Sequence, residues 1–130
     1  MDSGQPLLIP LEASAQWDDQ LVGGKASKLS QLAGAGFGVP RGFCLTTLAY
    51  QLFANNAAIG ATIRMELGRK PMDDMRWEEI WDAALRIRAT FLSQPLDGAL
   101  RETIAQGLAG LDPSAPLAVR SSAVGEDAVG

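Results

Sequence analysis

Histidine is absent from this sequence of 130 residues, and Cys44 is its single cysteine. Without histidine the chain lacks the most common general base, the most common zinc ligand and any phosphohistidine carrier. A lone cysteine excludes an internal disulfide and a cysteine-rich zinc site. Chemistry that needs histidine must therefore take place elsewhere. We interpret Cys44, which lies between Phe43 and Leu45, as a small buried apolar residue.

Basic charge and long apolar runs are also scarce. Lys and Arg number 11 against 15 Asp and Glu, which gives a net charge of −4. This balance gives no electrostatic reason for binding nucleic acid or a membrane surface. Pro10 interrupts the apolar run 7–11, which is too short for a signal sequence, and no stretch approaches a membrane span. We expect a cytoplasmic protein that binds neither nucleic acid nor membrane.

The residues that are present suit one compact domain. Hydrophobic residues make up 47% of the chain and charged residues 20%, which is enough to bury a core. We predict an α/β (α+β) fold that is helix-rich with a small sheet, in a single domain over residues 1–130. The expected strands are 7–11, 43–46 and a buried strand at 117–119, and the expected helices are about 25–33, 48–54, 59–67, 74–92 and 96–108.

The clearest helical pattern runs from Asp74, a plausible cap, to Leu92. Apolar residues recur on one face at successive turns, and only Arg88 interrupts them. Trp77 and Trp81 belong to this face. They could stack on a base, but helical spacing beside other apolar residues predicts that both lie in the core.

Two glycines before a lysine are the first candidate for ligand binding. Gly23 and Gly24 allow close approach of the backbone to a ligand, and Lys25 adds positive charge at a helix start, which suits phosphate. The pattern is not a Walker A loop, because Asp19 stands where glycine is needed and Ala26 where a magnesium-binding hydroxyl is needed. From spacing alone, a turn followed by a solvated lysine is the simpler interpretation.

Arg120, Ser121 and Ser122 form the second candidate. The arginine follows the predicted strand 117–119, and its rigid fork of donors matches phosphate oxygens beside two hydroxyls. An ion pair with an acidic group, such as those at 126–127, explains the arginine equally well from spacing alone. Both interpretations stay open at this point.

Glu126 and Asp127 form an acidic pair that resembles metal ligands or an acid/base dyad. Adjacent residues on an extended segment point to opposite faces, so joint action at one atom is disfavoured. We interpret the pair as part of a solvated loop. No metal site and no catalytic residue is predicted in this chain.

Three ordered blocks of sequence, Val22–Leu29, Val39–Tyr50 and Ala118–Asp127, resemble the ATP-binding domain of the phosphoenolpyruvate synthase / pyruvate phosphate dikinase family. They contain Val-Gly-Gly-Lys, Val-Pro-Arg-Gly-Phe and Val-Arg-Ser-Ser, in that order. The resemblance implies the first lobe of an ATP-grasp nucleotide-binding domain. It further implies that ATP is contacted by Lys25 and Arg120, with Gly23, Gly24, Ser121 and Ser122 close to its phosphates.

The same resemblance implies parts of the enzyme beyond this sequence. Family members place a glycine-rich loop after the Glu-Asp pair, then a second lobe with magnesium-holding carboxylates, a swivelling phosphohistidine domain and a domain for the acceptor. We therefore expect residues 1–130 to be a truncated N-terminal subdomain that is inactive alone. Its partners would be ATP and the missing domains of the same polypeptide, with Mg²⁺ held elsewhere in the full-length enzyme and phosphate passing through histidine to pyruvate.

Two alternatives to this interpretation remain. A related rifamycin antibiotic phosphotransferase would use the same ATP-binding lobe, and residues 43–47 lean slightly towards that branch. A non-catalytic helical module would instead dock a partner through its apolar helix faces. The gene beyond Gly130 discriminates the classes, because a stop codon favours the module, whereas a glycine-rich loop and a later histidine domain favour the enzyme.

Overall fold

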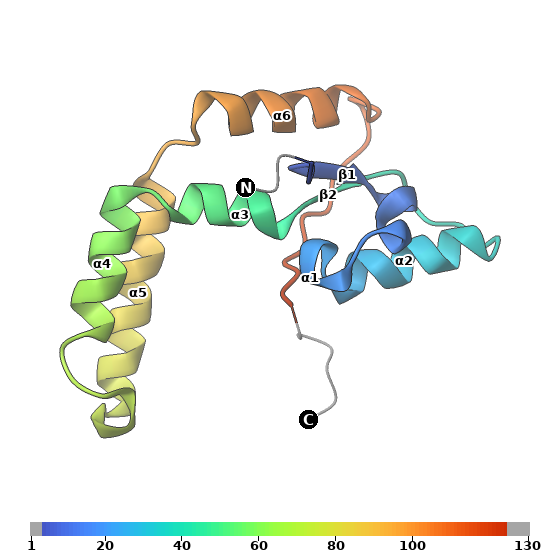
Figure 1. The fold of residues 1–130 in the computed structure, drawn as a ribbon. Helices are drawn as coiled ribbons and strands as arrows, with labels where there is room; N and C mark the ends of the chain where they lie inside the picture. The colour runs from blue at the N-terminus through green and yellow to red at the C-terminus, as the bar shows by residue number, and fades with distance from the viewer. Residues whose placement is uncertain (1–3, 125–130) are drawn as a thin grey trace. The chain divides into compact units, whose positions relative to one another are not determined.

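The computed structural model describes residues 4–124, and these form two compact units (Figure 1). The first unit contains residues 4–50 and 98–124, and the second contains Gln51–Asp97. Both units are rich in helix, and the one sheet of the described residues has two strands, in the first unit. The prediction of a helix-rich α/β chain with a small sheet is confirmed at this level.

Ten elements follow one another along the described chain. They are β1 (Leu8–Pro10), the 3₁₀ helix η1 (Leu11–Gln16), α1 (Asp19–Val22), α2 (Gly24–Gly34), β2 (Phe43–Leu45), α3 (Thr47–Ala54), α4 (Ala57–Leu67), the 3₁₀ helix η2 (Met72–Asp74), α5 (Trp77–Ser93) and α6 (Gly98–Ala109). Each helix predicted from apolar periodicity is present. The short helices η1, α1 and η2 were not predicted, because one or two turns are too short to show a period.

The sheet pairs β1 with β2 in antiparallel register, so that Ile9 lies opposite Cys44. Helix α6 packs against this sheet at Gly107. A Cβ atom at Gly107 would lie 2.6 Å from Leu8 Cδ1 and 2.9 Å from Phe43 Cε1. Glycine at this position therefore permits the close approach of α6 to the strands.

The core of the first unit surrounds the start of α2. Buried side chains of Ile9, Leu21, Val22 and Ala26 form one cluster. On the same helix the buried Ser30 hydroxyl donates to the Glu12 carbonyl oxygen at 2.8 Å, which satisfies a polar group inside the core. The first turn of α2 is thus fixed by α1, β1 and η1.

The predicted strand at 117–119 is wrong. These residues form no ladder, and Leu117 and Val119 are 56% and 96% exposed. An extended apolar segment becomes a buried strand only beside a partner strand. Within residues 4–124, β1 and β2 pair only with each other, and the segment 117–119 pairs with neither of them.

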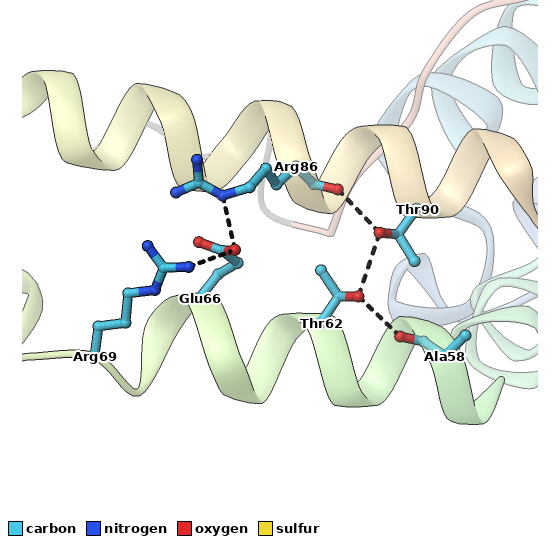
Figure 2. Close-up of polar contacts among 6 residues, drawn as sticks. All are labelled: Ala58, Thr62, Glu66, Arg69, Arg86 and Thr90. Carbon is cyan, nitrogen blue, oxygen red and sulfur yellow. Dashed lines mark hydrogen bonds and ion pairs between the residues drawn. The ribbon is translucent and has the colours of Figure 1, made fainter.

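The second unit is built on α4 and α5, which pack side by side (Figure 2). Glu66 of α4 is 1% exposed, and its Oε1 accepts from Arg86 Nε at 2.7 Å and from Arg69 at 3.1 Å. The Arg86 hydrogen bond is the main cause that lowers the pKa of Glu66. One turn before Glu66 on α4 and one turn after Arg86 on α5, Thr90 Oγ1 donates to Thr62 Oγ1 at 3.3 Å. Polar bonds thus hold the two helices together.

The placement of Trp77 and Trp81 in the core is also wrong, because their exposed fractions are 70% and 61%. Helix α5 packs on α4 through a different face, on which Ala83 is buried. The predicted cap Asp74 lies in η2 instead. Helix α5 is capped at Arg76, whose backbone N–H donates to the Glu79 carboxylate at 3.0 Å.

Candidate nucleotide-binding site

A glycine turn joins α1 to α2 at the centre of the candidate site. Gly23 is buried and has φ +80° and ψ 160°, a conformation that favours glycine. Its backbone N–H donates to the Asp19 carbonyl oxygen at 2.8 Å, which closes α1. Helix α2 begins at the next residue, Gly24, and Lys25 lies in its first turn as predicted. A helix start directs backbone N–H groups towards a bound anion.

The segment 120–122 passes across this helix start. Lys25 Nζ donates to the Ser121 carbonyl oxygen at 3.0 Å, although the two residues are 96 positions apart in the sequence. A Cβ atom at Gly23 would overlap Ser122 Oγ and lie 3.3 Å from Ser122 Cβ. The missing side chain of Gly23 therefore leaves the room that Ser122 occupies.

The structure thus brings the two predicted motifs together. Gly23 and Lys25 contact Ser121 and Ser122 directly. Arg120 precedes Ser121 on the same exposed segment, and no hydrogen bond or ion pair joins its side chain to another residue in the described range 4–124. The ion pair that the sequence offered as an alternative is not formed with any of these residues. Glu126 and Asp127 lie outside the described residues.

The chemistry of these groups suits anion binding. Lys25 and Arg120 are cationic donors, the two serines carry hydroxyl donors, and the start of α2 adds backbone N–H groups. This set contains no histidine or carboxylate, the usual general bases that activate a hydroxyl nucleophile. Burial raises the pKa of the nearby Cys44 thiol, which donates to the Val22 carbonyl oxygen at 3.3 Å. Cys44 is half-buried and holds β2 against α1.

Three residues that position the site were not predicted to do so. The Thr47 hydroxyl donates to the Gln20 carbonyl oxygen at 2.9 Å and ties α1 to the start of α3. Ser27 and Ser30 are buried on α2, on the side that faces the core. Their spacing of three residues, beside the buried Ala26, was the one signal in the sequence that could have indicated a buried face.

No group of three or more His, Cys, Asp or Glu side chains within residues 4–124 is arranged to hold a metal ion. In the same part of the chain, none of the helices combines the length and the apolar character needed to cross a membrane.

Comparison with known proteins identifies one family and several relatives. Residues 19–130 match the family model described as "Pyruvate phosphate dikinase, AMP/ATP-binding domain". Phosphoenolpyruvate synthase of Escherichia coli K12 is 32% identical over 97% of this chain and 16% of its own length. For the prodigiosin synthesizing transferase PigC of Serratia marcescens these values are 33%, 93% and 12%. Rifampicin phosphotransferase of Bacillus cereus is 30% identical over 82% of this chain and 12% of its own length. The chain therefore spans less than a fifth of the length of these relatives.

Proposed function

Since this chain belongs to the family of the pyruvate phosphate dikinase AMP/ATP-binding domain, we propose that it forms the first lobe of an ATP-grasp nucleotide site. In this site Lys25 and Arg120 contact the phosphates of ATP. Gly23 and Gly24 allow close approach of the ligand, with Ser121 and Ser122 beside it. The observation that carries the proposal is the Lys25–Ser121 hydrogen bond, because it joins the two motifs at the start of α2.

The role of these residues in phosphate transfer is electrostatic. Charge on the phosphoryl oxygens must be held in a fixed arrangement while phosphate leaves ATP, and ammonium and guanidinium groups provide that arrangement. The buried cluster under α2 keeps Lys25 in place, and the Gly23 turn keeps the 120–122 segment in contact with it. Neither Lys25 nor Arg120 serves as a nucleophile.

In the full-length protein, the proposed reaction transfers phosphate from ATP to a phosphohistidine domain and then to pyruvate. The name phosphoenolpyruvate synthase of the Escherichia coli relative supports this acceptor, and the greater length of the relatives leaves room for the further domains. Magnesium would accompany the ATP phosphates, and we assign it no ligand in this chain. The 130 residues alone form one side of the site and would be inactive.

The second candidate keeps the nucleotide site and changes the acceptor. The relative named rifampicin phosphotransferase supports transfer to a rifamycin antibiotic. Its identity of 30% is close to the 32% of the phosphoenolpyruvate synthase, so this domain does not separate the two acceptors. Assays of the full-length protein with pyruvate and with rifampicin as alternative acceptors would decide between them.

Alanine substitution tests the two cations in the full-length protein. Lys25→Ala or Arg120→Ala should each weaken ATP-dependent phosphorylation by about 2–4 kcal/mol, roughly 30- to 900-fold in kcat/KM, because each removes a charge-assisted phosphate contact. Arg101→Ala on α6 removes an exposed arginine outside the site and should leave kcat/KM unchanged. Unaltered kcat/KM in either site variant would refute the assignment of that residue.

Titration of the 130-residue chain with ATP tests the division into lobes. Half of a two-lobed cleft encloses the ligand poorly, so calorimetry should give an affinity weaker than about millimolar. Micromolar affinity of the isolated chain would show that the site is complete without a second lobe.

A further inference from the structure

Helix α5 carries apolar residues on two faces. On the inner face, towards α4, Ala83 is buried. Near the carboxyl end of α5, Phe91 contacts the ring of Phe53 of α3 with centroids 5.9 Å apart. On the outer face lies a row that we call the outer ridge, and it consists of Trp77, Trp81, Leu85, Arg88 and Leu92. The positions follow at intervals of four, four, three and four residues, which places them along one line of the helix.

The outer ridge is exposed along its whole length. The exposed fractions of its apolar members are 70% for Trp77, 61% for Trp81, 50% for Leu85 and 76% for Leu92. Tryptophan and arginine are the residue types that contribute most at protein interfaces. A helix that is apolar on two faces is typically covered on both, and a row with two exposed tryptophans marks an interaction surface.

We propose that the outer ridge is an interface between two copies of this chain, whose α5 helices pack antiparallel about a two-fold axis near residues 84–85. The order of residues along the ridge is the basis for this occupant. In the antiparallel arrangement Trp77 of each copy lies opposite Leu92 of the other, and Trp81 lies opposite Arg88. Leu85 packs beside the axis. The ridge is therefore complementary to itself, as a two-fold interface requires.

Charge along α5 favours the same direction of pairing. The amino-terminal half carries the exposed Glu78 beside the ridge, and the carboxyl-terminal half carries the exposed Arg88. Antiparallel packing brings Arg88 of one copy near the Glu78 carboxylate of the other and over the face of its Trp81, where a cation–π contact forms. Parallel packing would instead place like charges together. The opposed helix dipoles of an antiparallel pair are also favourable.

A different occupant would be another part of a longer polypeptide. Such an occupant would need an apolar surface of its own, but it would not require that the ridge complement itself. A single helix pair buries little area, so the self-association should be weak, with a Kd on the order of 10–100 µM. The inference concerns α5 alone and is independent of the proposed nucleotide site.

Sedimentation of the 130-residue chain over a range of concentrations tests the proposal. We expect a monomer–dimer equilibrium that Trp81→Ser and Arg88→Glu each weaken by about tenfold or more. Trp17→Ser and Arg101→Glu make the same changes outside the second unit and should leave the equilibrium unchanged. Circular dichroism checks that each variant keeps its helix content. The proposal is overturned if the chain stays monomeric to millimolar concentration. It is also overturned if neither Trp81→Ser nor Arg88→Glu changes the dimer dissociation constant, and the ridge then has another occupant.

Disulfide cross-linking tests the direction and register of the pairing. In a Cys44→Ser background, Leu85→Cys lies beside the proposed axis and should form a covalent dimer on mild oxidation. Glu78→Cys is the matched control, because antiparallel packing separates its two copies by roughly 20 Å along the helix. Equal cross-linking at both positions would indicate parallel packing, and failure at position 85 would exclude the axis; either result overturns the proposal.

Discussion

At the scale of the residue, Gly23 is the position of the proposed site that tolerates substitution least. Its φ of +80° with ψ of 160° lies in a region that side chains rarely adopt, and an added methyl group would overlap Ser122 Oγ. Gly23→Ala should therefore lower the free energy of unfolding by about 1–3 kcal/mol from backbone strain alone. It should also displace the 120–122 segment from Lys25. Urea unfolding measures the first effect, and amide chemical shifts of residues 120–122 measure the second.

Two further variants separate strain from overlap at Gly23. Gly34→Ala adds the same methyl group at the end of α2, where nothing lies within 4 Å of it, and should not destabilise the chain. The double variant Gly23→Ala/Ser122→Gly removes the overlap and keeps the strain. It should restore the shifts of the 120–122 segment without restoring full stability. Equal free energies of unfolding for Gly23→Ala and Gly34→Ala would contradict the positive-φ turn at Gly23.

The sequence predicted which residues meet at this site but not how they meet. The local pattern of Gly23, Gly24 and Lys25 suited phosphate, but it was the family resemblance that pointed to these residues and to Arg120 together. The contact of Lys25 with Ser121 crosses 96 positions and depends on how α6 returns the chain to the first unit, which no local pattern encodes. The direction of the Arg120 side chain depends on the same tertiary arrangement, so its role in binding ATP stays a prediction.

At the scale of the element, the α4–α5 pair depends on the ionised form of Glu66. The Arg86 hydrogen bond and the charge of Arg69 lower the pKa of this buried carboxylate, against desolvation, which raises it. The stabilisation that ionised Glu66 contributes is therefore complete above the pKa of this glutamate in the unfolded chain, about 4.3. It is lost as the pH falls through the lower pKa of Glu66 in the folded chain. Stability of the second unit should decline below about pH 4.3 partly for this reason.

Glutamine at position 66 tests this dependence on pH. Glu66→Gln removes the charge but leaves Arg86 beside it without its ion-pair partner, so it should destabilise the chain at neutral pH. The difference from the wild type should shrink as the pH falls, because the wild type then becomes protonated as well. Glu102→Gln on the exposed side of α6 is the matched control. A difference that is constant from neutral pH to pH 3 would contradict the linkage.

Prediction of the elements from the sequence succeeded where an apolar repeat continues over several turns. It failed where tertiary packing determines which face or segment is buried. The apolar repeats predicted α2, α5 and α6, and the glycines after residue 33 indicated where α2 ends. The same repeat could not say which face of α5 meets α4, because its apolar residues occupy both faces. The segment 117–119 was predicted as a strand from its composition, whereas strand formation depends on a neighbour that its own residues do not reveal.

At the scale of the whole molecule, the two units have separate buried residues and should respond separately to a cavity. Ile59, 0% exposed, lies in the second unit, and Ile9, 2% exposed, lies in the first. Ile59→Ala should cost about 2–5 kcal/mol, because it removes buried methyl groups and leaves a cavity. The loss should appear in the second unit, since Ile59 belongs to it.

Hydrogen exchange resolved by residue measures this separation. In Ile59→Ala, amides of Gln51–Asp97 should exchange faster while those of β1, β2 and α2 keep their protection. Ile9→Ala is the reciprocal variant, and it should speed exchange in the first unit, including the start of α2, while sparing α4 and α5. If each variant speeds exchange only in its own unit, substitutions on α5 should leave the nucleotide motifs of the first unit folded. The tests of the outer ridge depend on this independence. Equal loss of protection in both units for either variant would instead indicate one cooperative unit.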